Sequence, residues 1–401
     1  MCRFPERAGM LDDVTVVDFS QVRAGPWCTQ LLGLLGAEVI KVERPGTGAM
    51  ERGSEPKRNG VSADHLARNR HKASVAIDLK TEEGRQLAED LVADADVVVE
   101  NFSPGTMERL GLGYEDLATG NPDLVYASIK GYGERGPKAA AKGVDLVLQA
   151  EGGIMSVTGP EDGEPVKLGQ ALGDIGAGLY ATIGILAALY DRETGGPGQR
   201  VSTDLFGTIV SFLEEYLTEY GMTGEDPTPF GRRHQGRVPY EVAETADGHV
   251  AFLATGGDEG WETFVTEVLE TEELLEYDTL ASRLEHYDEI ADVMHPILRE
   301  RTTAEWQAIF DDHGFPNGPL NRISDVVDHP QTKELGYVVE HDHDVAGPVL
   351  LHGHPLHFSE GETRPTDDAP ALGEHTATVL RERLGLDGDE IDRLRDTGAV
   401  E

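Results

Sequence analysis

The sequence has little lysine, little cysteine and no long apolar run, and each shortage excludes a class of function. Of its 401 residues, 34 are Lys or Arg and 74 are Asp or Glu, which gives a formal net charge of −40. Only 9 of the cations are Lys. Such a chain is not expected to bind nucleic acid or an anionic membrane, because both attract cations. The acidity instead suits concentrated salt, whose ions screen the repulsion between carboxylates.

The chain contains two cysteines, Cys2 and Cys28. They cannot build a disulfide framework, so a reducing compartment is expected. The apolar neighbours of Cys28 predict a small core residue. No apolar run reaches the roughly 18 residues that a membrane-spanning helix needs, and residues 1–10 do not resemble a signal peptide. These features predict a cytoplasmic protein.

Short β-branched runs alternate with helical patterns over the first half of the chain. Helices are expected at 26–35 and 81–93, and Thr81 precedes two glutamates as at a capped helix N-terminus. Because the connections are short, we expect parallel strands joined by right-handed crossovers. This predicts an α/β fold with a doubly wound, Rossmann-like sheet. The predicted strands are 14–19, 38–42, 74–79, 96–101 and 124–129.

From about residue 230 the pattern changes to that of a smaller α+β domain. Segments 241–245 and 249–254 flank a Gly-containing turn and predict a hairpin. Helices are expected at 261–270, at 280–299 with an interruption at Pro296, at 303–313 and at 375–384. We expect a large domain over 1–205 completed by 370–401, a linker over 206–228, a small domain over 229–320 and a returning linker over 321–369. No internal repeat is found.

One glycine-rich segment, 131–136, matches the letters of the dinucleotide-binding fingerprint. Pro137 follows it directly, it comes after the fifth predicted strand, and no acid-ended strand follows at the required distance of about 20 residues. We therefore do not expect a dinucleotide site. The segment could line a ligand crevice or form a plain turn.

Asp174 lies among glycines just before a helix predicted over 179–190. It could serve only as the N-cap of that helix. The same place would suit a carboxylate nucleophile, because a helix N-terminus favours the ionised form and small neighbours let a bulky substrate approach. The residues alone leave both roles open.

Several cations fall at strand ends or in loops of the sheet domain, although the chain has few. They could jointly bind the phosphates of a cofactor, or they could be solvated surface residues. They are Arg23, Arg44, Arg109 and Lys142. A group of histidines near the end matches no zinc spacing, so a surface loop is favoured over a metal site. Its members are His341, His343, His352, His354 and His357.

A series of short motifs resembles the family III CoA-transferases, the group that contains formyl-CoA:oxalate CoA-transferase, carnitine CoA-transferases and α-methylacyl-CoA racemase. Each motif is weak alone, but together they follow the family's order nearly end to end. They include Ala24-Gly25-Pro26, residues 35–43 and 101–105, Arg109-Leu110-Gly111, Gly131-Tyr132-Gly133, Gly173-Asp174, residues 184–189 and 195–199, and residues 372–376.

The resemblance implies a Rossmann-like large domain and a small domain joined by long linkers, in two ring-shaped subunits that interlock as a homodimer. It implies CoA and acyl-CoA as substrates, with no permanently bound cofactor. It also implies that Asp174 is the nucleophile, which passes through an acyl-aspartyl anhydride and an aspartyl-CoA thioester. The implied CoA-binding residues are Val22, Arg44, Asn101, Phe102, Arg109 and Lys142, and Arg23 is expected to join them.

Two departures from the family's patterns narrow the activity. The family's racemases use a His as second acid/base, and the matching position here is Val144, which cannot move a proton. The oxalate-specific transferase carries a longer glycine-rich loop, where this chain has only Gly256-Gly257. We therefore expect a CoA-transferase that acts on small dicarboxylates, with succinyl-CoA and mesaconate as the favoured pair. The alternatives are another acid such as oxalate, carnitine or an aromatic acid, the racemase, and an inactive CoA-binding protein.

Overall fold

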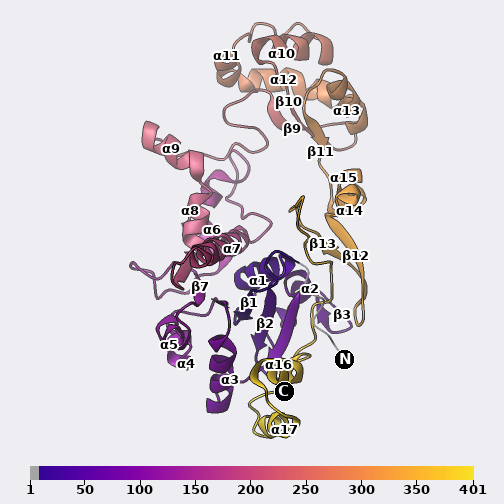
Figure 1. Ribbon diagram of the computed structural model, residues 1–401. Helices are drawn as coiled ribbons and strands as arrows, with labels where there is room; N and C mark the ends of the chain where they lie inside the picture. Colours follow the sequence, from indigo (N-terminus) through magenta and orange to yellow (C-terminus); the bar gives the residue numbers. More distant parts are fainter. Residues whose placement is uncertain (1–8) are drawn as a thin grey trace. The chain divides into compact units, whose positions relative to one another are not determined.

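The computed structural model describes residues 9–401 and divides the chain into two compact units (Figure 1). Cys2 lies outside the described residues. The first unit contains the chain up to Ile154, Lys167–Thr218 and Leu335–Glu401, and the second contains Met155–Val166 and Glu219–Glu334. Each unit has its own hydrophobic core, and each is described by itself.

The first unit is built on a six-stranded parallel sheet with strand order β5-β2-β1-β6-β7-β8. The chain runs from the central strand β1 outward to β5, returns to β6 and continues to β8, so the order reverses between β1 and β6. The predicted α/β class with a parallel sheet is confirmed, although β8 was not predicted. The strands are β1 (Thr15–Asp18), β2 (Glu38–Glu43), β5 (Lys72–Ala76), β6 (Val97–Glu100), β7 (Val125–Lys130) and β8 (Arg200–Asp204).

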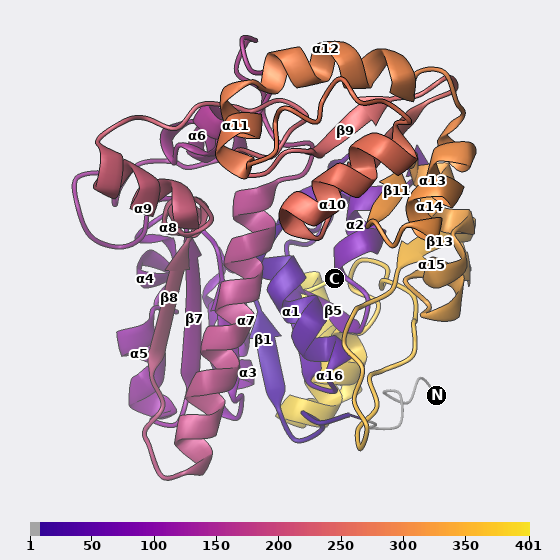
Figure 2. The same ribbon diagram turned by 90° about the horizontal axis from the view of Figure 1, so that it is seen from above.

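Helices cover both faces of this sheet, because alternate strand residues point to opposite sides. Val16 packs with α1 (Ala24–Leu34) and α7 (Leu172–Glu193), whereas Val17 packs with α3 (Glu82–Ala93) and α16 (Thr376–Leu384). Figure 2 shows α1 and α7 side by side over the near face of the strands. The predicted cap is present, since the Thr81 hydroxyl accepts a hydrogen bond from the N–H of Gly84 at 2.9 Å.

Helix α7 differs from the prediction at its start. It begins at Leu172, its N-cap residue is Ala171, and Asp174 therefore lies inside the first turn. The N-cap interpretation of Asp174 is wrong. Within residues 9–401, α7 is the one helix with the length and apolar composition to cross a membrane, and half of that apolar stretch is buried inside the fold, as for a core helix.

The remaining elements of the first unit are short. The C-terminal segment returns to the sheet, where Thr376 Oγ1 accepts a hydrogen bond from the N–H of Ala76 and Val400 pairs with Ile77. These elements are η1 (Met50–Gly53), β3 (Lys57–Arg58), β4 (Val61–Ser62), α2 (Ala63–Arg68), α4 (Thr106–Leu110), α5 (Tyr114–Gly120), α6 (Asp145–Glu151), α8 (Leu205–Ser211), β12 (Val338–His343), β13 (Gly347–His352) and α17 (Gly388–Asp396). Two elements, η2 (Ile154–Val157) and α9 (Glu214–Thr223), lie where the chain passes from one unit to the other.

The second unit contains the predicted hairpin, extended by a third strand. Strands β9 (Tyr240–Glu244) and β10 (His249–Leu253) are antiparallel, and β11 (Asn317–Pro319) pairs with β10. The predicted break at Pro296 is wrong: Pro296 lies in the last turn of α12, and the break falls at His286. The helices are α10 (Gly257–Thr263), the π-helical turn η3 (Phe264–Val268), α11 (Leu280–Glu285), α12 (Tyr287–Leu298), α13 (Thr303–Asp312), α14 (Ile323–Asp328) and α15 (Pro330–Glu334).

Candidate active site

A cavity of about 680 Å³ lies at the carboxyl ends of strands β1, β2, β5 and β6, where the strand order reverses. Open α/β sheets bind their ligands at this kind of crevice. Phe19 and Gln21 line it after β1, Arg44 after β2 and Phe102 after β6. Lys80, which follows β5, also lines it and was not among the predicted residues. The cavity therefore combines an aromatic ring with cations, which suits a ligand that carries a base and phosphates.

The other residues implied to bind CoA lie around this cavity in different ways. Arg109 is exposed on α4 and donates a hydrogen bond to the hydroxyl of Thr106, a lining residue, at 2.9 Å. The Asn101 amide binds the backbone N–H and C=O of Gln21, at 2.9 and 2.8 Å, and so fixes the loop after β1. Lys142 is exposed in the loop before α6 and does not line the cavity.

The loop between β1 and α1 connects the cavity to Asp174. Its first residues line the cavity, and its last, Arg23, is the N-cap residue of α1. A Cβ atom built on Gly178 would lie 2.6 Å from the carbonyl oxygen of Ala24, so α7 approaches the start of α1 too closely for any side chain at that position. Asp174 lies one turn before Gly178 on the same face of α7. The nucleophile candidate is therefore next to the end of this loop.

Asp174 is half-buried, and its charged neighbours shift its pKa in opposite directions. Burial raises the pKa of Asp174, and the nearby carboxylate of Asp145 raises it further, whereas the charges of Arg23 and Arg68 lower it. The balance is a pKa of about 6. At neutral pH the group is still ionised, and it is more basic than an ordinary aspartate, as a carboxylate nucleophile should be.

Asp145 is the first residue of α6, and its carboxylate is held in place by hydrogen bonds. One oxygen accepts the N–H of Gly173 at 2.8 Å and the other accepts the Gln149 amide at 2.6 Å. Asp145 therefore anchors the first turn of α7, the turn that carries Asp174. Val144, directly before Asp145, is 62% exposed, so its side chain is available to a bound molecule but offers it only methyl groups.

The two arginines beside Asp174 differ in how firmly they are held. An Arg68 guanidinium nitrogen lies 2.8 Å from the Asp64 carboxylate, and Arg68 Nε donates to the carbonyl of Val22 at 3.2 Å. Arg23 lies 3.7 Å from the same Asp64 oxygen. Arg68 was missed by the sequence analysis, although residues 68–72 read Arg-Asn-Arg-His-Lys, a rare cluster of bases in this acidic chain.

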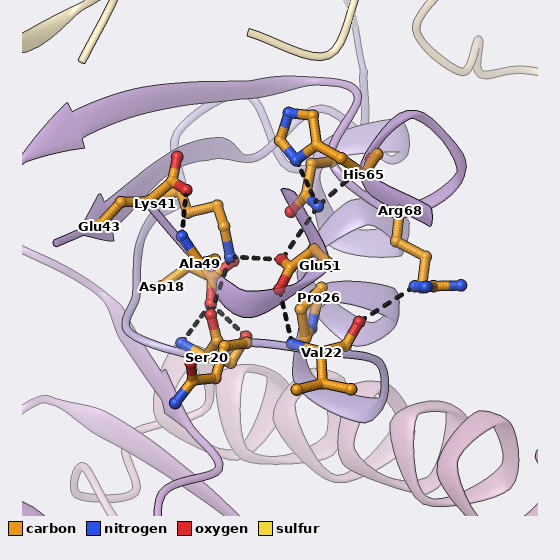
Figure 3. A network of polar contacts seen from close by, with 12 residues as sticks. Asp18, Ser20, Val22, Pro26, Lys41, Glu43, Ala49, Glu51, His65 and Arg68 are labelled. Carbon is orange, nitrogen blue, oxygen red and sulfur yellow. Dashed lines mark hydrogen bonds and ion pairs between the residues drawn. The ribbon is translucent and has the colours of Figure 1, made fainter. Parts of the chain in front are cut away.

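Val22 occupies an unusual backbone conformation that a buried polar network maintains. Its φ of 70° is a left-handed value that β-branched residues rarely adopt. Figure 3 shows the reason: the Val22 N–H donates to Glu51 at 2.7 Å while its carbonyl accepts from Arg68. Glu51 is itself buried, 3.4 Å from the Lys41 ammonium. Burial would raise the pKa of Glu51, but Lys41 and the Val22 N–H lower it, so the carboxylate stays ionised.

The same network continues from Lys41 to Asp18, the last residue of the central strand β1. Asp18 is fully buried and accepts hydrogen bonds from Thr29 at 2.7 Å and from the Lys72 ammonium at 3.1 Å. Burial acts to raise the pKa of Asp18, but Lys72 and Lys41 outweigh it and lower the value to about 2. Fixed charges of this kind hold the loop above them in one conformation.

The histidine group does not gather around one point. His341 contacts Asp368, the His343 ring accepts the N–H of Val345 at 3.0 Å, and His352 packs edge-on against Trp27. Within residues 9–401 no three His, Cys, Asp or Glu side chains come together as a metal site would require. Cys28 is buried, and burial raises the pKa of its thiol to about 12, so it is a core residue, as predicted.

Sequence comparison supplies the class of this site. The chain matches CoA-transferase family III over residues 11–376, and it belongs to that family. It is therefore a CoA-transferase, whose substrates are CoA thioesters and carboxylates. The resemblance inferred from the motifs is confirmed.

Individual relatives are similar over nearly their whole length. A succinyl-CoA:mesaconate CoA-transferase of Haloarcula hispanica is 37% identical, with 93% of this chain and 96% of the relative covered. A succinyl-CoA:glutarate CoA-transferase of Mus musculus is 35% identical, with 98% and 90% covered. The crystal structure of a CAIB/BAIF family protein from Brucella suis superposes with a TM-score of 0.85 at 34% identity and covers 94% of this chain and 100% of its own.

Proposed function

We propose that this protein transfers CoA from succinyl-CoA to a small dicarboxylic acid, with mesaconate as the favoured acceptor and Asp174 as the nucleophile. The observation that carries the mechanism is the environment of Asp174, a half-buried carboxylate with a pKa near 6 beside two arginines. We further propose a cytoplasmic, interlocked homodimer adapted to high salt.

The transfer needs no proton and no redox step. A carboxylate oxygen of Asp174 attacks the thioester carbon of the acyl-CoA, the C–S bond breaks, and CoA leaves as a thiolate from an acyl-aspartyl anhydride. The thiolate then attacks the aspartyl carbon, the C–O bond to the acyl group breaks, and the donor acid leaves as a carboxylate. The acceptor carboxylate then attacks the thioester carbon of aspartyl-CoA, the C–S bond breaks, and a mixed anhydride of Asp174 and the acceptor forms. The CoA thiolate attacks the acceptor carbonyl of this anhydride, the C–O bond to Asp174 breaks, and the acceptor departs as its CoA thioester while the Asp174 carboxylate is regenerated.

The site supports a defined orientation of CoA. Phe102 and the cations Arg44 and Lys80 line the cavity, while Arg23 ends the loop that leads from the cavity to Asp174. We propose that the nucleotide end of CoA occupies the cavity and that the pantetheine arm follows the loop past Val22. Arg109 would bind phosphates of CoA at the margin of the cavity. Lys142 would bind CoA from the loop before α6, near Asp145.

The choice of acids rests on relatives and on charge. The relatives from Haloarcula and mouse are both named for succinyl-CoA paired with a small dicarboxylic acid, at 37% and 35% identity. The net charge of −40 favours succinyl-CoA and mesaconate, the pair for which the Haloarcula relative is named, because such an acidic surface suits concentrated salt. Racemisation is disfavoured because Val144 cannot act as an acid or base. The short Gly256-Gly257 segment at the start of α10 disfavours oxalate as acceptor.

A panel of acids tests this proposal. The purified protein is incubated with succinyl-CoA in about 1 M KCl and, in turn, mesaconate, glutarate, oxalate, carnitine and an aromatic acid, and the CoA esters are identified by mass. We expect mesaconyl-CoA to form fastest, and Asp174→Ala to abolish transfer while CoA still binds. Hydroxylamine should inactivate the wild type only when acyl-CoA is present, because only then does Asp174 carry an activated acyl group. Transfer that persists in Asp174→Ala would remove Asp174 from the mechanism.

A further inference from the structure

Of the two arginines beside Asp174, Arg23 is the one that is held less closely by a neighbouring carboxylate. In the described part of the chain, residues 9–401, the Arg23 guanidinium pairs with the Asp64 carboxylate. The distance between them is 3.7 Å, which is too long for a hydrogen bond. Asp64 is already bound more closely by Arg68, at 2.8 Å. The Arg23 side chain is 25% exposed, against 8% for Arg68. Arg23 therefore keeps hydrogen-bond donors for a ligand, whereas Arg68 is a fixed part of the protein.

The backbone places Arg23 near Asp174, close enough for its charge to act on that carboxylate. It follows Val22, whose left-handed conformation is held by Glu51 on one side and Arg68 on the other. It precedes Ala24, whose carbonyl packs against Gly178, one helical turn from Asp174. Arg23 therefore lies level with Asp174, at the opposite end of the loop from Gln21, which lines the cavity. This position is better suited to the acyl end of the substrate than to its phosphates.

The charge of the site changes during the proposed reaction. In the resting enzyme Asp174 is an anion beside Arg23. Once Asp174 carries CoA as a thioester it is neutral, while Asp145 stays bound to Gly173 and Gln149 and Asp64 stays bound to Arg68. Arg23 then faces a site that has lost one negative charge. The free acids of the reaction are anions, and a guanidinium can bind a carboxylate with two parallel hydrogen bonds.

We propose that Arg23 binds a carboxylate group of the free acid substrate while Asp174 carries CoA. This rests on the proposed function, and it assigns Arg23 to the acid and not to CoA. The charge of Asp174 keeps the acid out of the resting site, and its loss on thioester formation admits the acid beside the activated carbon. Arg23 is thus a specificity-determining residue for carboxylate acceptors.

The test separates the two substrates kinetically. Arg23→Gln and Arg23→Lys are compared with Arg395→Gln, which removes the same charge from the exposed helix α17, and with Arg44→Gln at the cavity. For Arg23→Gln we expect the KM of the acceptor acid to rise at least about tenfold, with the KM of succinyl-CoA changed less than about twofold. Arg23→Lys should lie between wild type and Arg23→Gln, because the charge remains but the forked geometry is lost. Arg44→Gln should raise the KM of succinyl-CoA instead.

The outcomes distinguish this inference from the function it rests on. A wild type that transfers no CoA to any acid refutes the proposed function. An active wild type whose Arg23→Gln variant loses affinity for succinyl-CoA alone, or for neither substrate, overturns the role of Arg23. If Arg23→Gln does not fold, Arg23→Lys decides the matter by its acceptor KM, since an unchanged value would refute a bidentate contact.

A matched pair of acceptors identifies which carboxylate Arg23 holds. Glutarate and valerate have the same chain length, and only glutarate has a second carboxylate. If Arg23 holds the distant carboxylate, the preference for glutarate shrinks in Arg23→Gln. If it holds the reacting carboxylate, the KM rises equally for both acids. Either result supports the proposal, and a KM that rises for neither acid overturns it.

Discussion

Replacing Asp174 by Asn should abolish transfer and yet make the protein more stable at neutral and alkaline pH. The pKa of Asp174 is raised from 3.8 to about 6 in the folded chain, chiefly by burial and then by Asp145. Ionised Asp174 therefore destabilises the fold relative to the unfolded chain. A shift of about 2 units corresponds to about 3 kcal/mol, and partial exposure of the group reduces this to about 2 kcal/mol.

The pH dependence follows from the sign of the shift. Because the folded pKa is the higher one, the destabilisation is absent below about pH 4 and complete above about pH 6. Asn has nearly the same shape and does not titrate. For a unit of this size, about 2 kcal/mol corresponds to a rise in Tm of roughly 4–8 °C. The Asp174→Asn variant should therefore melt higher than the wild type at pH 8, and the difference should close as the pH falls toward 4.

Thermal melts between pH 4.5 and 8 in about 1 M KCl would measure this. Asp162→Asn is the matched control, because Asp162 is exposed in a turn and the substitution removes the same charge. The control should melt within about 1 °C of the wild type at every pH. An Asp174→Asn variant that melts at or below the wild-type temperature at pH 8, or a gap that does not narrow at low pH, would refute the electrostatic account of this site.

Further tests address the pH profile, the salt requirement, the buried network and the excluded activity. The kcat/KM for acyl-CoA should fall below about pH 6, since Asp174 must be ionised, and Asp145→Asn should move this limb to lower pH by removing a like charge; an unmoved limb would contradict the coupling. Lowering KCl from about 1 M to 0.1 M lengthens the Debye screening length from about 3 to 10 Å and should lower the Tm. Sucrose should not restore the Tm, because a neutral osmolyte does not screen charge. Glu51→Gln should lower the Tm and reduce kcat/KM about tenfold, because it leaves Lys41 less compensated and loosens the Val22 loop. An unchanged kcat/KM would show that the network serves stability alone. In deuterated buffer a 2-methylacyl-CoA should return without deuterium at C2, and incorporation as fast as transfer would restore the racemase hypothesis despite Val144.

The central strands were predictable because their β-branched runs are short, buried and bounded by turn residues. Strand β8 was missed for the opposite reason: it is an edge strand, polar and half-exposed, and its sequence RVSTD carries no clear core face. The early start of α7 was missed because glycine disfavours helices locally, whereas here Gly178 is needed for close packing against α1. At α7, tertiary contact therefore outweighed local propensity.

Of the candidate site, the motifs led to Asp174, Arg44 and Phe102, because each follows a strand or begins a helix of the sheet domain. Arg68 and Glu51 could not be inferred in the same way. Their importance comes from hydrogen bonds to the two sides of one residue, Val22, and such convergence depends on how distant segments meet. The break at His286 was not predicted either. Pro296 lies in the last turn of α12, so the helix ends shortly after this proline and is not interrupted by it.

Several features that oppose folding lie together at the carboxyl edge of the six-stranded sheet. Buried lysines and carboxylates lie under the loop after β1, Val22 adopts a left-handed conformation, and Asp174 carries a raised pKa. A buried ion pair is weak as a source of stability, and an apolar core would serve stability better. These charges do, however, fix a short loop that begins at the cavity and ends beside Asp174. That is the arrangement a transferase needs, since its long substrate must be held at one end while its thioester is brought repeatedly to the same carboxylate.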